Sequence, residues 1–140
     1  MKIKPNTILT LDQYINEALY NKKMGYYMKT NPFKSNGDYI TSPNISILFS
    51  EMIAIWIISF WQNLKSPKNF NLIELGAGNG EMMKQILSTF NNFPKFKKYC
   101  KIYILEKSSY LKKIQKKNLK YQNVYWLKNI NEVANLPSIF

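Results

Sequence analysis

Three glycines at alternate positions are the feature of this sequence best suited to chemistry. They lie in the segment Glu-Leu-Gly-Ala-Gly-Asn-Gly, residues 74–80, between a short apolar stretch and an amphipathic one. Glycine lets a chain turn tightly and lets a ligand come close to the backbone. Such a loop after a strand is typical of nucleotide-like cofactor sites, although a purely structural turn can have the same composition.

The spacing of the loop argues against phosphate-bearing ligands. A dinucleotide site has the pattern Gly-x-Gly-x-x-Gly, whereas here the third glycine comes one residue early and Glu81 takes its place. A carboxylate in the first turn of a helix would repel a pyrophosphate. A P-loop would end in Gly-Lys-Ser or Gly-Lys-Thr, which this segment lacks.

Two glutamates favour S-adenosylmethionine, a cofactor without phosphate. Glu74, at the end of one predicted strand, can accept a hydrogen bond from the amino group of the cofactor, and Glu106, at the end of the next, can accept from both ribose hydroxyls. We therefore predict a cofactor site formed by Glu74, Gly76, Ala77, Gly78, Gly80 and Glu106, with Thr41 lining it. Glu106 is equally well interpreted as a solvated strand end, and Ser42 beside Thr41 as a helix cap.

Strands and helices are predicted to alternate around this loop. Strands are expected at 70–75, 101–105 and 123–127, and helices at 81–90, from Ser108 or Ser109 to 119, and briefly at 130–134. This alternation predicts a parallel sheet with right-handed crossovers. Residues 136–140 resemble the beginning of a fourth strand, and three strands would leave one sheet edge unpaired. The expected fold class is α/β, with an N-terminal helical segment before an incomplete Rossmann-like sheet.

The N-terminal part is predicted to be helical. Thr10 can cap a helix over 11–21, a loop follows at 29–38, and Ser42 with Pro43 can open a second helix. Residues 45–61 are the most hydrophobic segment and contain one charge, Glu51. A membrane span needs about 20 apolar residues, so a buried or interface helix is favoured over a membrane segment. We assign residues 1–66 to a helical substrate cap and 67–140 to the first half of the cofactor domain.

Composition excludes several other sites and partners. The chain of 140 residues has no histidine and one cysteine, so it cannot build a Ser-His-Asp triad, a disulfide or a zinc cluster, and we expect no metal. The net charge of +12 accompanies abundant Asn, Ile and Tyr and a lack of Arg. That profile indicates an AT-rich genome rather than a nucleic-acid partner. Finding no apolar signal-peptide segment, we expect a cytoplasmic bacterial protein.

Several blocks resemble the MidA family of class I S-adenosylmethionine-dependent methyltransferases, which includes the mitochondrial complex I assembly factor. They are Leu-Asp-Gln-Tyr-Ile-Asn-Glu-Ala-Leu-Tyr at 11–20, Gly-Tyr-Tyr at 25–27, Gly-Asp-Tyr-Ile-Thr-Ser-Pro at 37–43, Ile-Ser at 45–46, Phe-Ser-Glu at 49–51, the glycine loop, and Leu-Glu-Lys-Ser at 105–108. The block at 37–43 is the most family-specific. Family members are considerably longer, so we expect this chain to be a fragment matching their N-terminal portion.

The resemblance implies N-methylation of a protein side chain, with an arginine of a respiratory complex I subunit as the suggested acceptor. Carboxylates orient a guanidinium well, which makes Asp38 and Glu51 the candidate catalytic residues. Their plainer roles are a turn cap for Asp38 and a buried, hydrogen-bonded carboxylate for Glu51. Asn44 stands where the family usually has glutamate.

Two other functions stay open: a non-catalytic remnant or module that binds the cofactor, and a basic protein that binds nucleic acid or a membrane surface. We also expect a second polypeptide or an oligomer to complete the fold, because a three-stranded sheet leaves a backbone edge and helix faces uncovered.

Overall fold

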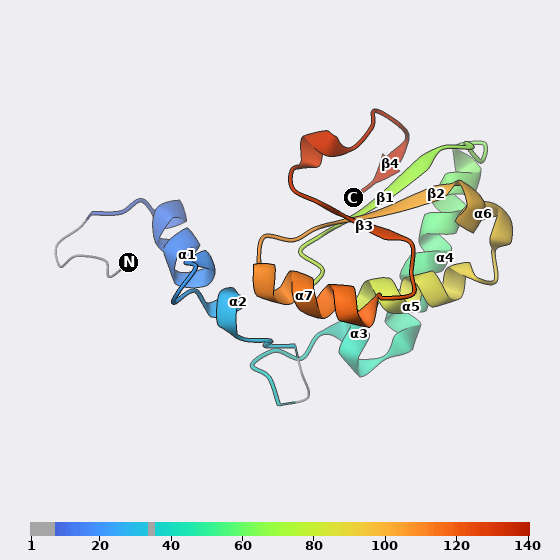
Figure 1. Cartoon of the computed structure of the whole chain (residues 1–140). Coiled ribbons are helices and arrows are strands. Elements are labelled where there is room, and N and C mark those ends of the chain that lie inside the picture. Colours follow the sequence, from blue (N-terminus) through green and yellow to red (C-terminus); the bar gives the residue numbers. More distant parts are fainter. Residues whose placement is uncertain (1–7, 34–35) are drawn as a thin grey trace.

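One parallel sheet forms the centre of the molecule. A computed structural model describes residues 8–33 and 36–140. The prediction that residues 1–7 carry no signal peptide lies outside the described residues, as do residues 34–35 of the loop predicted at 29–38. The strands are β1 (Phe70–Leu75), β2 (Cys100–Leu105), β3 (Val124–Leu127) and β4 (Ser138–Ile139), arranged in the order β3-β2-β1-β4 (Figure 1). All three strand pairs are parallel, which confirms the predicted α/β fold.

Helices connect the strands as the alternation predicts. After β1 come α5 (Glu81–Phe90) and the short α6 (Pro94–Tyr99), and after β2 comes α7 (Ser109–Asn118), capped by Ser108. A short 3-10 helix, η1 (Ile130–Glu132), lies between β3 and β4. The chain passes from β3 back across the sheet to the free side of β1, so the strand order reverses beside β1. In open parallel sheets, ligands bind at the carboxyl ends of the strands near such a reversal.

The described residues of the N-terminal part form four helices, namely α1 (Leu11–Tyr20), α2 (Tyr26–Lys29), α3 (Ser42–Ile45) and α4 (Ile47–Asn63). Thr10 caps α1 as predicted, in a capping box with Gln13. The helix predicted to begin at Ser42 is broken at Ser46, whose backbone is extended (φ −146°, ψ 128°). The Ser46 hydroxyl accepts a hydrogen bond from the Leu48 amide at 3.2 Å, so the serine restarts the helix as the N-cap of α4.

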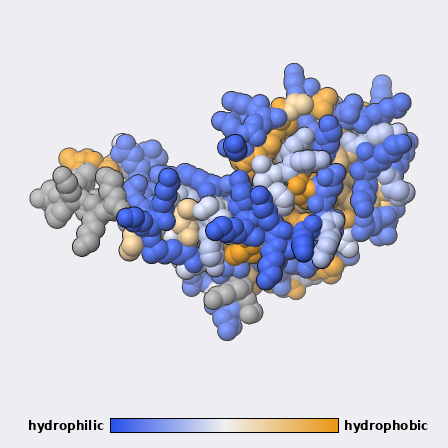
Figure 2. All heavy atoms as spheres, viewed as in Figure 1, coloured by the Kyte–Doolittle hydropathy of each residue, from blue (hydrophilic) through white to orange (hydrophobic). Residues whose placement is uncertain are grey.

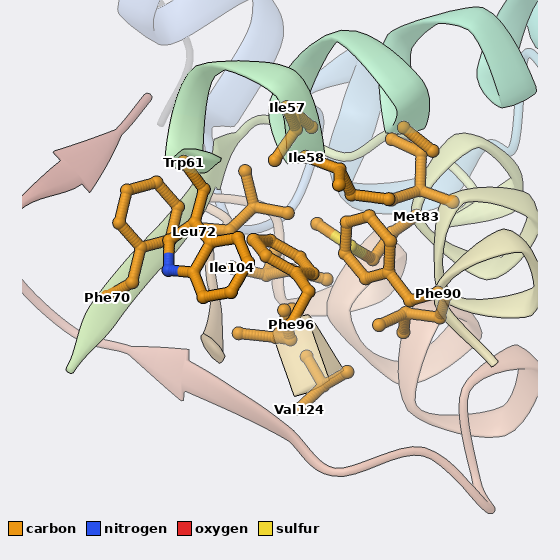
Figure 3. Close-up of a cluster of buried hydrophobic side chains, with 14 of the residues drawn as sticks. Ile57, Ile58, Trp61, Phe70, Leu72, Met83, Phe90, Phe96, Ile104 and Val124 are labelled. Atoms are coloured by element: carbon orange, nitrogen blue, oxygen red, sulfur yellow. The ribbon is translucent and has the colours of Figure 1, made fainter. Parts of the chain in front are cut away.

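The core lies between the sheet and the helices (Figure 3). Trp61 of α4 and Phe70 of β1 both pack edge-on against Phe96 of α6, with ring centroids 5.2 Å and 6.0 Å from it. The sequence did not predict α6, because six residues are too few to show a helical period, and the burial of Phe96 holds it in place. The division at residue 66 stays a prediction, although α4 on its N-terminal side supplies core side chains.

Asn71 holds the short fourth strand against β1. Its side chain is fully buried, and its Nδ2 donates to the carbonyl oxygen of Ala134 and to Oγ of Ser138, both at 3.2 Å. The backbone register pairs Leu72 with Ile139. The predicted beginning of a fourth strand is therefore present, and it pairs with β1 over two residues.

The outward face of α4 is strongly apolar. Leu48, Met52 and Trp56, spaced four residues apart, are each more than half exposed. The face of the molecule in Figure 2 is mostly hydrophilic, with hydrophobic side chains showing in separate patches. None of the helices in the described part of the chain has both the length and the hydropathy of a membrane span.

Candidate functional site

The glycine loop turns sharply at the end of β1. Gly76, Gly78 and Gly80 have φ angles of +71°, +55° and +83°, a region that L side chains rarely adopt. A Cβ atom on Gly76 would meet nothing within 4 Å, whereas one on Gly78 would lie 3.2 Å from the ring of Phe33. The loop therefore leaves open space over its first glycine and is covered at its second.

Glu74 brings an unsatisfied carboxylate to this open space. Its Oε2 is buried and has no hydrogen-bond partner among the described residues. Burial, and secondarily the negative charge of Glu106, raise the pKa of Glu74 to about 7. An unpaired buried carboxylate is costly, so this position favours a ligand that brings a cation or a hydrogen-bond donor.

Glu106 is held rigidly on the other side of the loop. The residue is only 8% exposed, and its two carboxylate oxygens accept hydrogen bonds from the Ser108 amide (2.7 Å) and from Nε2 of Gln115 (2.9 Å). Because a carboxylate has about four acceptor positions, it can still accept from ligand hydroxyls.

Gln115 connects this carboxylate to the glycine loop. Its buried amide also donates to the carbonyl oxygen of Gly78 at 3.0 Å and accepts from Nε1 of Trp126 at 3.0 Å. The sequence alone did not single out Gln115. The only signal was a glutamine four residues after Leu111, on the side of α7 that faces the core.

Two cavities flank the loop, and both are lined by Phe33, Gly76 and Gly78. The first, of about 150 Å³, opens onto Glu74. The second, of about 140 Å³, opens onto Glu106. The two glutamates predicted to bind opposite ends of one ligand thus face neighbouring cavities that share the same central wall.

The remaining predicted cofactor residues lie close by. Thr41 and Ala77 line the first cavity. Thr41 also stands at the N-cap of α3, where its Oγ1 accepts from Nδ2 of Asn44 at 3.0 Å. Gly80 lines neither loop cavity. It packs on α7, because a Cβ atom on Gly80 would lie 3.5 Å from Cα of Gln115.

The two predicted catalytic carboxylates lie elsewhere. Asp38 is exposed and accepts a hydrogen bond from the Tyr26 hydroxyl, which raises the pKa of Tyr26 to about 12. Asp38 lines a separate polar cavity of about 300 Å³ together with Lys29 and Tyr110. Glu51 is partly exposed on α4 and lines neither loop cavity. Their catalytic role stays a prediction.

The N-terminal helices close the second cavity. Tyr20 at the end of α1 and Tyr27 in α2 form part of its wall. The Ser108 hydroxyl donates to the backbone carbonyl of Tyr27, and Nζ of Lys107 donates to Oδ1 of Asn16 at 2.6 Å. Lys107 also lies 4.4 Å from the ring centroid of Tyr20, in a cation–π contact. These contacts fasten α1 and α2 to the residues that follow Glu106.

Comparison with known proteins identifies the family. Residues 52–140 match the model of a family described as "Putative S-adenosyl-L-methionine-dependent methyltransferase". Among curated proteins, the Drosophila melanogaster "Protein arginine methyltransferase NDUFAF7 homolog, mitochondrial" is 34% identical over 136 residues, 97% of this chain and 30% of that protein. The chain belongs to the MidA family of S-adenosylmethionine-dependent methyltransferases.

Other relatives agree with this membership. The human "Protein arginine methyltransferase NDUFAF7, mitochondrial" is 37% identical over 125 residues, covering 88% of this MidA-family chain and 28% of the human protein. The chain thus spans about 30% of the length of the curated relatives. The names of these relatives place them in mitochondria, which contradicts the expected cytoplasmic bacterial localisation. That expectation was wrong because it depended on the lack of an apolar signal-peptide segment and on a codon-biased composition, and neither of these reports a compartment.

Solved structures show the same fold. A crystal structure of a Burkholderia thailandensis protein bound to S-adenosyl-homocysteine superimposes with a TM-score of 0.69 at 24% identity. The match covers 86% of this MidA-family chain and 33% of the Burkholderia chain. A second, native structure from the same organism gives a TM-score of 0.63 at 24% identity, with coverage of 87% and 31%.

Proposed function

We propose that this chain binds S-adenosylmethionine across the two loop cavities and acts in methyl transfer to arginine of a protein, with a respiratory complex I subunit as the acceptor. The observation that carries the proposal is the pair of glutamates on either side of the open space over Gly76: Glu74, whose Oε2 is buried, and Glu106, which is 8% exposed. Arginine as acceptor is supported by the names of the curated relatives, which are protein arginine methyltransferases.

The residues present fit this cofactor. Its α-amino group would neutralise Glu74, whose buried Oε2 lacks a partner among the described residues. Its ribose hydroxyls would take the free acceptor positions of Glu106. Glu81 lies at the N-terminus of α5, the position at which a phosphate-binding loop presents backbone amides to its ligand. Its Oε2 lies 3.8 Å from Nζ of Lys84. The site is therefore suited to a cationic ligand without phosphate.

The cofactor supplies a methyl group on a sulfonium, and its transfer is an in-line displacement that depends mainly on positioning. In this chain Glu74, Glu106 and the glycine loop would position the donor. Asp38 and Glu51 stay the candidates for orienting the acceptor guanidinium, although Asp38 lines a separate cavity and Glu51 lines neither loop cavity. Thr41 would line the donor side of the site.

Calorimetric titration tests the binding half of the proposal. The wild-type chain should bind both S-adenosylmethionine and S-adenosylhomocysteine. Gly78→Val should abolish binding of both, because valine is strained at φ +55° and its side chain would push Phe33 from the loop. Lys84→Ala, on the exposed side of α5, is the matched control and should bind like wild type. Circular dichroism reports whether each variant is folded, and failure of the folded wild type to bind either ligand would overturn the proposal.

Tritium transfer from labelled cofactor tests the catalytic half. Incubation with isolated complex I subunits, followed by amino-acid analysis, should yield methylarginine. The separate positions of Asp38 and Glu51 favour one alternative, a cofactor-binding module without catalysis. Tight cofactor binding without labelled arginine would support that alternative and contradict the enzymatic proposal.

A further inference from the structure

We propose that the ring of Phe33 lies against the sulfonium centre of the methyl donor and makes the site prefer the cationic donor over its neutral product. Phe33 lies in the loop between α2 and α3. This inference rests on the proposed function, since it concerns a residue of the same site, and it assigns that residue a role in ligand discrimination.

The position of Phe33 is central to the site. Among the described residues, it is one of three that line both loop cavities, and its ring lies 3.2 Å from the position of a Cβ atom on Gly78. Glu74 belongs to one cavity and Glu106 to the other. A ligand that reaches both glutamates must therefore pass over Gly76 and along Phe33. In S-adenosylmethionine the atom between the amino-acid part and the ribose is the sulfur.

The backbone of Phe33 is anchored by two hydrogen bonds, and its ring lies beside another aromatic ring. The backbone carbonyl of Phe33 accepts hydrogen bonds from Nδ2 of Asn44 (3.2 Å) and of Asn79 (3.3 Å). The ring is nearly parallel to that of Tyr27, with an interplanar angle of 4° and a centroid separation of 6.5 Å. Asn79 belongs to the glycine loop and Asn44 to α3, so Phe33 is positioned by the same segments that form the site.

An aromatic ring at this position distinguishes the two ligands by charge. The face of the ring attracts cations through its quadrupole. The donor carries a sulfonium cation, whereas the product has a neutral thioether in the same place. Leucine would keep most of the apolar contact and remove the quadrupole, so Phe33→Leu should affect the donor more than the product.

Calorimetric dissociation constants for both ligands test the inference. Phe33→Leu should weaken S-adenosylmethionine binding about 3- to 10-fold and S-adenosylhomocysteine binding less than about 2-fold. Tyr39→Leu is the matched control, because its ring lies 6.1 Å from that of Phe33 but lines neither loop cavity. The control should leave both constants unchanged.

Equal losses for both ligands, or no loss for either, would overturn the role of Phe33. If the wild type binds neither ligand, the proposed function fails instead. Fluorinated phenylalanine at position 33 provides a second test that preserves the shape of the side chain if the leucine variant does not fold. Affinity for the donor should fall as fluorine atoms are added while affinity for the product stays nearly constant, and a parallel change in both would contradict the inference.

Discussion

Glu74 is a residue of the candidate site whose acidity depends strongly on its surroundings. Burial, followed by the charge of Glu106, raises the pKa of this carboxyl from an ordinary 4.5 to about 7. Because its pKa is higher in the folded state than in the unfolded state, this carboxyl binds its proton more tightly in the folded chain. The resulting contribution to the free energy of unfolding is complete below about pH 4.5 and is lost as the pH rises through 7.

The ligand-free chain should therefore lose stability with rising pH. We expect Glu74 to lower the free energy of unfolding by on the order of 3 kcal/mol between pH 4 and pH 8, because each pKa unit corresponds to about 1.4 kcal/mol. Urea denaturation at a series of pH values measures this loss. Glu74→Gln should remove it, whereas Glu17→Gln, on α1, should retain it. A Glu74→Gln variant that keeps the full wild-type pH dependence would contradict this account of Glu74.

Glu106 should contribute equally to the binding of donor and product, since both ligands carry the ribose. Glu106→Ala should weaken each by about 1–3 kcal/mol, the usual value of a hydrogen bond to a charged group. Calorimetry on both ligands measures the two losses, with Glu132→Ala on η1 as the control. A loss confined to one ligand would show that Glu106 does not hold the ribose.

At the scale of elements, α6 depends on one side chain. Phe96 is 1% exposed and packs against Phe90, with ring centroids 4.7 Å apart. Phe96→Ala should lower the free energy of unfolding by about 3–5 kcal/mol, because it leaves a cavity in the aromatic core. Lys98→Ala on the exposed side of the same helix should change it by less than about 0.5 kcal/mol. Equal urea midpoints for the two variants would contradict this account of α6.

The elements could be predicted from the sequence where local signals define them. Thr10 and Ser108 cap the helices assigned to them, and β1 and β2 end at Leu75 and Leu105 as predicted. The break at Ser46 was not predicted, since a serine inside an apolar run also fits a continuous helix.

The candidate site could be predicted only in part. Glu74 and Glu106 follow from their positions at strand ends, which parallel strands bring to one edge of the sheet. Phe33, Tyr27 and Gln115 could not be assigned, because they reach the site through tertiary contacts that connect residues far apart in the chain.

At the scale of the whole molecule, the exposed face of α4 should make the chain self-associate. Leu48 and Met52 are each 60% exposed on neighbouring turns, and contiguous apolar surface of this kind promotes association. Sedimentation velocity should show concentration-dependent association that Leu48→Lys with Met52→Lys reduces without changing cofactor affinity. Tyr121→Lys, at an isolated residue that is 90% exposed, should leave association unchanged. A wild-type chain that stays monomeric at all concentrations would contradict this expectation.

A crystal structure of the chain with S-adenosylhomocysteine would show whether one ligand spans the two loop cavities. We expect electron density over Gly76, with the ribose hydroxyls at Glu106, the amino group at Glu74 and the ring of Phe33 beside the sulfur. Ligand density in the polar cavity at Asp38, or on the apolar face of α4, would contradict this binding mode.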